Sequence, residues 1–458
     1  MILASTIYNS FADNVVWSYM IQIFILIGAL LIGNIIRRKV KFIKRSLMPT
    51  ALLGGLLILI VKFIPAVNDF IDEGFMEIIT YHTLGIGFIA LSFKTAKDSQ
   101  KTSTKTVVET GLLTGAVYLL QAFIGLAVTI TMVLLSFDQV IPGGGVLLAL
   151  GFGQGTGQAL NYGKLYENSY GFDGGTTFGL TIATMGFIVS SLVGVIYMNI
   201  LKRKGQLVIA DESVRKAEVL SDYVEENEIP NTESVDKFTI NISLILVVYA
   251  IVFAVMKLIN IDLIWGFNFL LGTIFATGFR AAFKILKKHN IMHRDLTNNY
   301  LLDRISGFMF DTMIIAGVAA IDLTQLSNLV VPLLIICILG TCGTFIYIRF
   351  ASNHLYKGYQ HQMFFAMFGM LTGTASNGMI LLREVDPKFE TPAATTLVLQ
   401  SLPAIIFGGG LLLLLAYCPL GLKEAIITFV IVIAALLIYT LVIFRKLIFK
   451  KKNKQVSK

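Results

Sequence analysis

The stretch ALGFGQGTGQALNYGK, residues 149–164, places glycine at four alternate positions, and its setting decides how the chain folds. Glycine-rich loops often bind phosphate, so a nucleotide site is the first hypothesis. The dinucleotide motif GxGxxG is absent, because the sixth residue counted from Gly151, Gly153 or Gly155 is never a glycine. No GK[ST] follows either. The glycines therefore need another explanation.

The composition is that of a membrane protein. Of the 458 residues, 55% are hydrophobic and 14% are charged, and the mean hydropathy is +0.77. Soluble proteins carry about 25% charged residues. Apolar runs of about 20 residues recur, as membrane-spanning helices require. The sequence predicts an all-α polytopic membrane protein with spans near 15–36, 48–67, 76–93, 107–135, 174–200, 238–258, 262–283, 305–322, 325–349, 391–417 and 424–446.

Two further apolar segments, 141–160 and 361–382, are rich in glycine and threonine. Each contains the pattern GxxxGT, as GFGQGT and as GMLTGT, and the two copies are 218 residues apart. After each copy come a phenylalanine, a short turn and a pair of threonines that opens a long helix. The same order of elements in both halves indicates an internal repeat.

The basic residues indicate how these two segments meet the membrane, because Lys and Arg in short loops accumulate on the cytoplasmic side. If both segments are re-entrant, 33 of the 37 basic residues lie on one side. If both cross fully, 14 of them move to the other side. We therefore expect two re-entrant loops and two halves of five spans each, with the second half inverted. The N-terminus is then outside and the C-terminus cytoplasmic.

These expectations divide the chain into five parts. The linker between the halves is its only long polar stretch, with six basic and nine acidic residues. The predicted parts are a first half at 1–201 with a re-entrant loop at 141–160, a linker at 202–237, a second half at 238–417 with a re-entrant loop at 361–382, an extra span at 424–446 and a basic tail at 447–458.

The glycine-rich segments are the predicted substrate site. Irregular backbone at membrane depth persists only where it is packed in protein or lines a polar cavity. In transporters with broken helices, half-helix N-termini attract anions and unwound carbonyls coordinate sodium. The alternative is that the glycines merely allow close helix packing. The predicted substrate-binding residues are Gly153, Gln154, Gly155, Thr156, Gly157, Thr372, Gly373, Thr374, Ser376 and Asn377.

Candidate sodium ligands follow the first of these segments. Thr177, Thr181 and Thr184 share one face of the predicted helix at 174–200, although such hydroxyls also bond back to their own helix. Asp311 lies six or seven residues inside an apolar span, where an acidic residue is a functional candidate. The alternative interpretation is that Asp311 lies near the membrane interface and pairs with Arg304.

Several other classes of protein are disfavoured. The enzyme motifs HExxH and GxSxG are absent, and the three cysteines have neither CxxC spacing nor a histidine-rich partner. The N-terminus lacks the basic residues of a cleavable signal peptide. The net charge of +9 reflects basic loops between spans rather than a nucleic-acid surface. A channel filter or charge ring and a soluble sensor domain are not evident either.

The stretch GFGQGTGQALNYGKLYENSYGFDGGTTFGLTIATMGFIVSSLVG, residues 151–194, resembles the bacterial sodium/glutamate symporter family. In that family a GxGTG stretch precedes a KL…YGF turn and a helix that begins with small residues. The resemblance implies two inverted five-helix halves, sodium-coupled uptake of an acidic amino acid, and a homodimer with an elevator-type movement. This chain departs from the family in having Gln154 where a histidine precedes GTG, and in having an eleventh span.

Together these observations predict a non-enzymatic transporter in the bacterial plasma membrane. It would take up glutamate, or a similar small carboxylate, by alternating access, with Na⁺ as the coupling ion and no cofactor. An alternative keeps the fold but carries another organic carboxylate or couples to protons, and Asp311 is then the titratable candidate in the path. A channel or membrane sensor is the remote alternative.

Overall fold

A computed structural model describes residues 13–94, 102–207, 231–260, 265–266, 268–291, 296–387 and 390–455. These residues form helices, and none of them is in a strand. In the first half the elements are α1 (Asn14–Lys39), α2 (Lys41–Ser46), α3 (Thr50–Val61), α4 (Pro65–Asn68), α5 (Glu73–Phe93), α6 (Thr104–Leu134), η1 (Pro142–Val146), α7 (Leu147–Gln154), α8 (Thr156–Tyr170) and α9 (Gly175–Arg203). In the second they are α11 (Asn231–Ile259), α13 (Asn268–Lys288), α14 (Asn299–Ala319), α15 (Leu323–Leu355), α16 (Gln360–Thr372), α17 (Ala375–Val385), α18 (Ala393–Leu399), α19 (Ser401–Leu414), η2 (Cys418–Leu420) and α20 (Leu422–Gln455).

Eight of the described helices are long and apolar enough to cross a membrane, or nine if the bent pair α18 and α19 forms one span. The expectation of a polytopic all-α membrane protein is therefore confirmed. Two of the eleven predicted spans do not pass this test. The segment near 48–67 yields only the 12 residues of α3, and α14 carries Asp303, Arg304 and Asp311. Most of the predicted linker, residues 208–230, lies outside the described residues.

Helix starts follow local capping chemistry. Asp72, Asn298 and Asp322 each precede a helix, and each side chain accepts a backbone N–H from the first turn. Such caps satisfy amide groups that would otherwise have no partner inside the helix. At the C-terminal end of α1, the basic residues Arg37, Arg38 and Lys39 lie in the last turn, where their charges complement the helix dipole.

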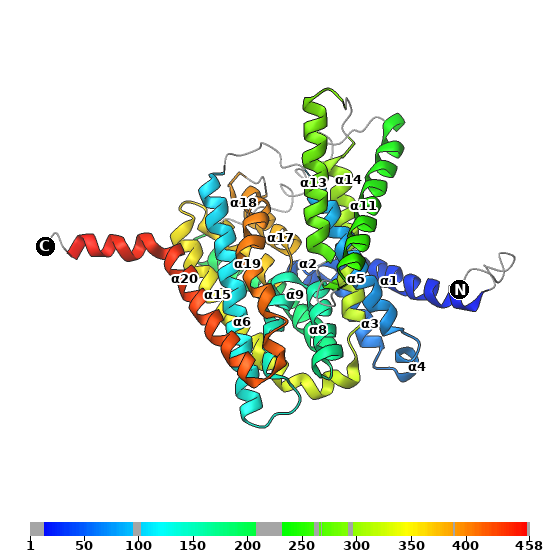
Figure 1. The fold of residues 1–458 in the computed structure, drawn as a ribbon, viewed down its shortest axis with the longest axis horizontal. Coiled ribbons are helices and arrows are strands. Elements are labelled where there is room, and N and C mark those ends of the chain that lie inside the picture. The colour runs from blue at the N-terminus through cyan, green and yellow to red at the C-terminus, as the bar shows by residue number, and fades with distance from the viewer. Residues whose placement is uncertain are drawn as a thin grey trace.

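The helices divide into two bundles, which lie on opposite sides of the molecule in Figure 1. The scaffold bundle consists of α1, α3, α5, α11, α13 and α14. The hairpin bundle consists of α6 to α9 and α15 to α20. Two clusters of buried apolar residues belong to the hairpin bundle and one to the scaffold bundle. A fourth cluster joins the bundles, because Leu160, Leu180 and Phe187 of the hairpin bundle pack into it.

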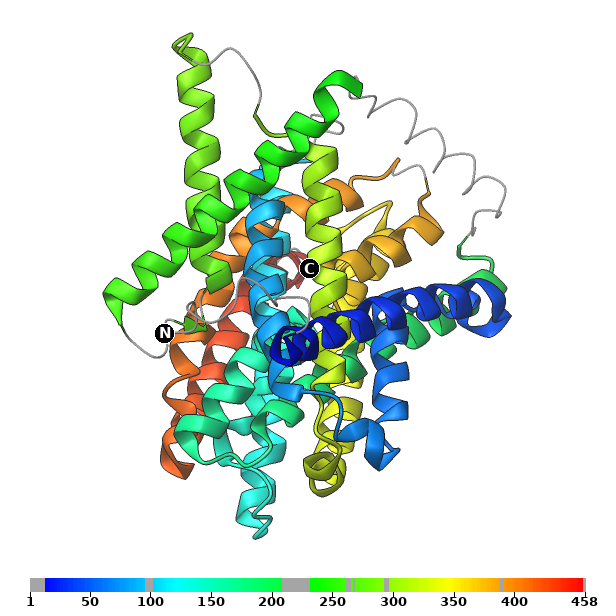
Figure 2. The ribbon, with the colours of Figure 1, turned by 90° about the vertical axis from the view of Figure 1, so that its right-hand side faces the viewer.

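Helices from the first and second halves of the chain pack antiparallel in two places. On α6 and α15, Gln121 bonds Thr344 and Thr110 bonds Tyr356, so rising residue numbers on one helix meet falling numbers on the other. On α5 and α14, Lys94 pairs with Asp303, and a Cβ on Gly87 would touch Phe310. In Figure 2 the dark blue helix α1 lies across the front of helices that run roughly vertically.

A fully buried lysine joins three scaffold helices. Lys62 follows α3, and its ammonium donates to the carbonyls of Ala319 at 3.1 Å and Ile321 at 2.7 Å. It also pairs with Glu73 in the first turn of α5. The cation thereby satisfies carbonyls at the C-terminal end of α14, where a positive charge complements the helix dipole.

The last helix, α20, packs on the hairpin bundle. The Tyr439 hydroxyl donates to the carbonyl of Phe407 on α19 at 3.0 Å, and Thr440 lies 2.9 Å from the Tyr347 hydroxyl of α15. The predicted extra span is thus the first part of a longer helix, which extends through residues 447–455 of the predicted tail.

Candidate functional site

Gly155 breaks the helix between α7 and α8. Its φ of 80° and ψ of −170° lie in a region that essentially only glycine adopts. The chain doubles back at this break, because both ends of the segment lie together. A Cβ on Gly144 would lie 2.9 Å from the Phe172 ring, and the Tyr166 hydroxyl donates to the Leu415 carbonyl near Gly143. We call η1, α7 and α8 (residues 142–170) the first hairpin.

A second break, at Gly373 and Thr374, separates α16 from α17. These two helices pack closely and antiparallel: a Cβ on Gly369 would lie 2.7 Å from the Cα of Gly378, and one on Gly378 would lie 2.3 Å from the carbonyl of Ala366. Only glycine permits such a close approach of two backbones. We call α16 and α17 (residues 360–385) the second hairpin.

The tips of the two hairpins meet. A Cβ on Gly155 would lie 3.4 Å from Cγ2 of Thr374 and 3.9 Å from the carbonyl oxygen of Gly373. The carbonyl of Thr372 lies against Gly186 of α9, which also contacts Phe152 of the first hairpin. The two glycine-rich segments identified in the sequence are therefore brought together at one place.

Both helices that leave the tips begin without a side-chain cap. Neither α8, which follows Gly155, nor α17, which follows Thr374, has a side-chain hydrogen bond at its N-cap position. The first backbone N–H groups of a helix have no partner within it, and the helix dipole makes this end positive. Two positive helix ends therefore converge, which is an arrangement that binds anions.

Polar side chains support the two tips. The Gln121 amide on α6 donates to the Thr344 hydroxyl at 3.1 Å and to the Leu371 carbonyl at 2.8 Å. On α17, the Asn377 amide donates to Ser190 of α9 at 2.8 Å. Sequence reasoning did not single out Gln121 or Ser190. A lone amide inside the apolar run 107–135 is the signal that marks Gln121.

The predicted substrate residues differ in how the structure surrounds them. Thr156 is fully buried and donates to the Met313 carbonyl of α14, and Gly157 also packs against Met313. Gly153 is buried against the Tyr118 ring. In the second hairpin, Ser376 is exposed. The others are buried (Gly155, Thr372, Gly373, Asn377) or partly exposed (Gln154, Thr374).

The three candidate threonines of α9 have different partners. The Thr177 hydroxyl accepts from the Asp322 amide at 3.1 Å, and Thr184 bonds back to the carbonyl of Leu180. The Thr181 hydroxyl is buried and has no hydrogen-bond partner in the described part of the chain. Thr181 lies on the stretch of α9 that packs against both sides of the first break, through Gly179 and Ile182.

Asp311 faces a cation that sequence reasoning did not connect with it. Arg37, near the end of α1, interacts electrostatically with Asp311 on α14 and with Glu384 on α17. The Arg37 guanidinium also donates to the Thr50 hydroxyl of α3, at 3.4 Å. Among the described residues, no group of three His, Cys, Asp or Glu side chains is placed to hold a metal ion.

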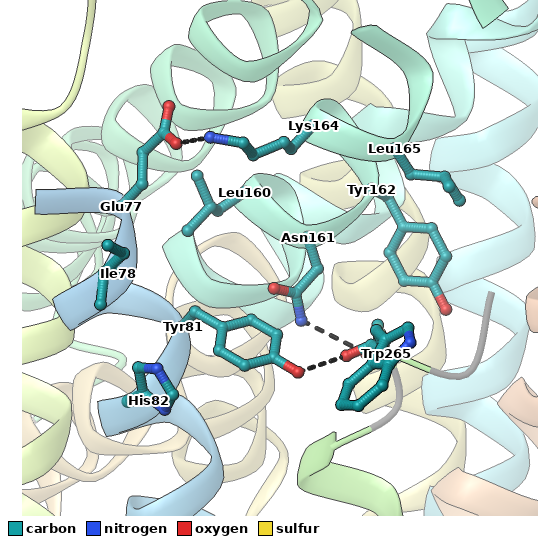
Figure 3. A pocket seen from close by; sticks show the side chains of 11 residues that line it. Glu77, Ile78, Tyr81, His82, Leu160, Asn161, Tyr162, Lys164, Leu165 and Trp265 are labelled. Carbon is teal, nitrogen blue, oxygen red and sulfur yellow. Dashed lines mark hydrogen bonds and ion pairs between the residues drawn. The ribbon is translucent and has the colours of Figure 1, made fainter. Parts of the chain in front are cut away.

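A cavity of about 290 Å³ lies at the opposite end of the bundle interface (Figure 3). One wall is the first turns of α5, another is α8, and Trp265 with Gly266 forms a third. Lys164 of α8 pairs with Glu77 of α5 across the cavity mouth, and the Asn161 amide donates to the Gly266 carbonyl at 3.3 Å. Nothing in the sequence around Lys164 identifies Glu77 as its partner.

The family model described as sodium/glutamate symporter matches residues 17–390, which include both hairpins and most of both bundles. No curated protein and no solved structure matches the chain significantly. The match covers well over half of the sequence, so this chain belongs to the sodium/glutamate symporter family.

Proposed function

We propose that this protein couples the inward movement of Na⁺ to the uptake of glutamate or a similar acidic amino acid. The observation that carries the proposal is the meeting of two uncapped helix N-termini at Gly155 and Thr374. Converging positive helix ends suit a substrate carboxylate, and the backbone amides there can donate to it. Membership of a family of sodium symporters, which are transporters rather than enzymes, supports the same reading.

The two hairpins are, in this proposal, re-entrant loops of an inverted repeat. Gly373 follows Gly155 by 218 residues, as α13 follows α3 and α18 follows α9 at their first residues. The corresponding helices α6 and α15 run antiparallel, as an inverted repeat requires. The packing matches as well, because α3 packs on α14 of the other half, and α13 packs on α5.

The proposed orientation in the plasma membrane follows the basic residues. Lys94 pairs with Asp303 at the end of the scaffold where Arg280 also lies, and Arg445 lies near Glu109 at the corresponding end of α6. This end carries most of the basic groups, so we assign it to the cytoplasm. The N-terminus is then outside and the C-terminus inside.

For sodium we propose the carbonyl end of α7 together with the Thr181 hydroxyl. Carbonyls at a broken helix and hydroxyl oxygens are suitable ligands for a hard cation. Thr177 and Thr184 already bond to backbone groups, so we give them a supporting role. Arg37 already supplies a positive charge to Asp311 and would repel a sodium ion there. We therefore assign Asp311 to a gate on the cytoplasmic side rather than to sodium binding.

Transport would proceed by an elevator-like movement of the hairpin bundle along the scaffold bundle. The first hairpin meets the scaffold through Thr156 and Gly157 against Met313 and Leu84, and through polar contacts of Lys164 and Asn161 at its outer end. Most other buried apolar residues pack within one bundle, and an interface between two such bodies permits sliding. The scaffold, which would remain fixed, is then the surface for the expected second copy of the chain.

The test is uptake of labelled L-glutamate by proteoliposomes, with the purified full chain and an imposed Na⁺ gradient. We expect uptake that requires inward Na⁺ and that collapses when Na⁺ is equal on both sides. Uptake of the same size without Na⁺ would contradict the coupling, and a pH gradient then tests the proton-coupled alternative. Competition by unlabelled dicarboxylates tests the alternative cargo.

A further inference from the structure

We propose that the cavity between α5 and α8 is an outer binding site for an α-amino acid, in which the ligand inserts between Lys164 and Glu77. In this site the Lys164 ammonium binds a ligand carboxylate, and Glu77 with Asn161 binds the ligand ammonium. The inference rests on the proposed function and goes beyond it, because it adds a second site, outside the hairpin tips, that recognises the ammonium group of the ligand.

The charges that line the cavity explain this choice. Lys164 is half exposed, whereas only 16% of the Glu77 side chain is exposed. A carboxylate so deeply placed is costly without a cation beside it. The two side chains come from different bundles, so any separation of α8 from α5 removes the cation from Glu77. An ammonium group supplied by a ligand satisfies Glu77 in its place.

The cavity also offers an acceptor that the folded chain does not use. The amide nitrogen of Asn161 donates to Gly266, but its buried oxygen has no hydrogen-bond partner among the described residues. Figure 3 shows Asn161 between Lys164 and the aromatic wall formed by Tyr81 and Trp265. The Tyr81 hydroxyl donates to the Trp265 carbonyl at 2.7 Å, whereas the Asn161 amide oxygen, in the same cavity as Glu77, has no donor among the described residues. It suits an N–H donor.

The same chemistry rejects a dicarboxylate that lacks an amine. Such a ligand would occupy Lys164 and leave Glu77 buried beside a second negative charge. A site whose buried polar groups require a partner discriminates strongly against an analogue that lacks it. L-Glutamate and glutarate have the same carbon chain and two carboxylates, and they differ only in the ammonium group. They are therefore the matched pair of probes.

Trp265 makes binding at this cavity directly observable, because the chain has only two tryptophans. In a Trp17→Phe parent, we expect L-glutamate to change Trp265 fluorescence with saturation, and glutarate to require at least a tenfold higher concentration. Glu77→Gln should weaken glutamate binding at least tenfold and abolish the preference over glutarate. Lys164→Met should weaken both ligands. Equal responses to the two ligands, or no saturable response, would overturn the proposal.

Two controls make the result specific. Lys94 and Asp303 form an ion pair within the scaffold bundle, so Lys94→Met and Asp303→Asn should titrate like the parent. Gly155→Ala impairs the hairpin tips and should stop uptake while keeping the Trp265 response. Loss of that response in Gly155→Ala would place the ligand at the tips and overturn the outer site. A Trp265 response without any uptake in the parent would instead reject the transport function and leave the outer site standing.

Discussion

The two hairpins have the same construction but different surroundings. Each breaks at a glycine, and each returns through a helix whose N-terminus has no side-chain cap. The first tip is buried against the scaffold, where Thr156 bonds the Met313 carbonyl, whereas Ala375 and Ser376 at the second tip are exposed. The same kind of helix break therefore lies in two different environments. The difference indicates a conformation in which the second hairpin is the uncovered one.

The largest effect should come from Gly155→Ala. Its backbone lies in a region that costs an alanine about 1–3 kcal/mol, which corresponds to about a 5-fold to 150-fold loss of the correct tip conformation. Gly373 has a φ of −147°, outside the left-handed region, although an added Cβ would lie 2.5 Å from the Asn377 amide nitrogen and 3.1 Å from the Gly369 carbonyl oxygen. Uptake rates in proteoliposomes should therefore fall far more for Gly155→Ala than for Gly373→Ala.

Gly171→Ala is the matched control for backbone strain. Gly171 also has a positive φ, of 69°, but it lies away from the tips with open space around its Cα. We expect Gly171→Ala to transport at close to the parental rate. If it loses as much uptake as Gly155→Ala, backbone strain at any positive-φ glycine of this region explains the loss, and the tips have no special role.

The next largest effect concerns how accessible the two hairpin tips are to a reagent in solution. In a background with Cys342→Ser, which removes the exposed native thiol, Ser376→Cys should react with a polar maleimide at least about tenfold faster than Thr156→Cys. The reason is that the first tip must separate from the scaffold before it can react. Reaction is measured by mass spectrometry over time. Equal rates would remove the difference between the hairpins.

A smaller effect should distinguish Thr181 from Asp311 in how strongly uptake depends on the Na⁺ concentration. Thr181 lies beside the first break, whereas Asp311 interacts electrostatically with Arg37. Loss of one cation ligand costs about 1–3 kcal/mol, so Thr181→Val should raise the half-saturating Na⁺ concentration about tenfold or more. Asp311→Asn should change it by less than about threefold. The opposite order would make Asp311 the ligand.

The smallest effect should follow loss of the side-chain hydrogen bonds that support a single hairpin. Gln121→Leu removes donors to Thr344 and to the Leu371 carbonyl of the second hairpin, at a cost of about 1–3 kcal/mol. Thr129→Val removes the matching support of the first hairpin, where Thr129 bonds the Pro142 carbonyl at 2.7 Å. The midpoint temperature of thermal unfolding should fall by a few degrees in both variants. Only Gln121→Leu should also speed labelling at Ser376→Cys.

The sequence predicted what depends on local backbone chemistry. The glycine-rich patterns drew attention to the segments 141–160 and 361–382, and the structure breaks its helices within them, at Gly155 and Gly373, which lie close together. Apolar length predicted an all-α membrane protein, and this is confirmed. It failed for α3, which is only 12 residues long, and for α14, which carries three charged residues. Hydropathy does not record where packing ends a helix.

The partners of polar residues could not be predicted. Asp311 was weighed against Arg304, its neighbour in sequence, but it faces Arg37 on a distant helix. Lys164 and Glu77 are 87 residues apart, and nothing local marks them as a pair. Such pairs are set by how the bundles pack. A single sequence carries the need for a partner, because a buried charge requires one, but not its identity.

The attachment of α20 to the hairpin bundle has a further consequence. Its apolar stretch, Leu422–Arg445, is 24 residues long, and much of its surface faces away from the protein. If the hairpin bundle moves as proposed, this lipid-facing rod travels with it and carries its hydrophobic length through the bilayer. Hydrophobic mismatch costs fractions of a kcal/mol per ångström. The turnover of this carrier should therefore depend on acyl-chain length, so that the thickness of the surrounding membrane helps to set its pace.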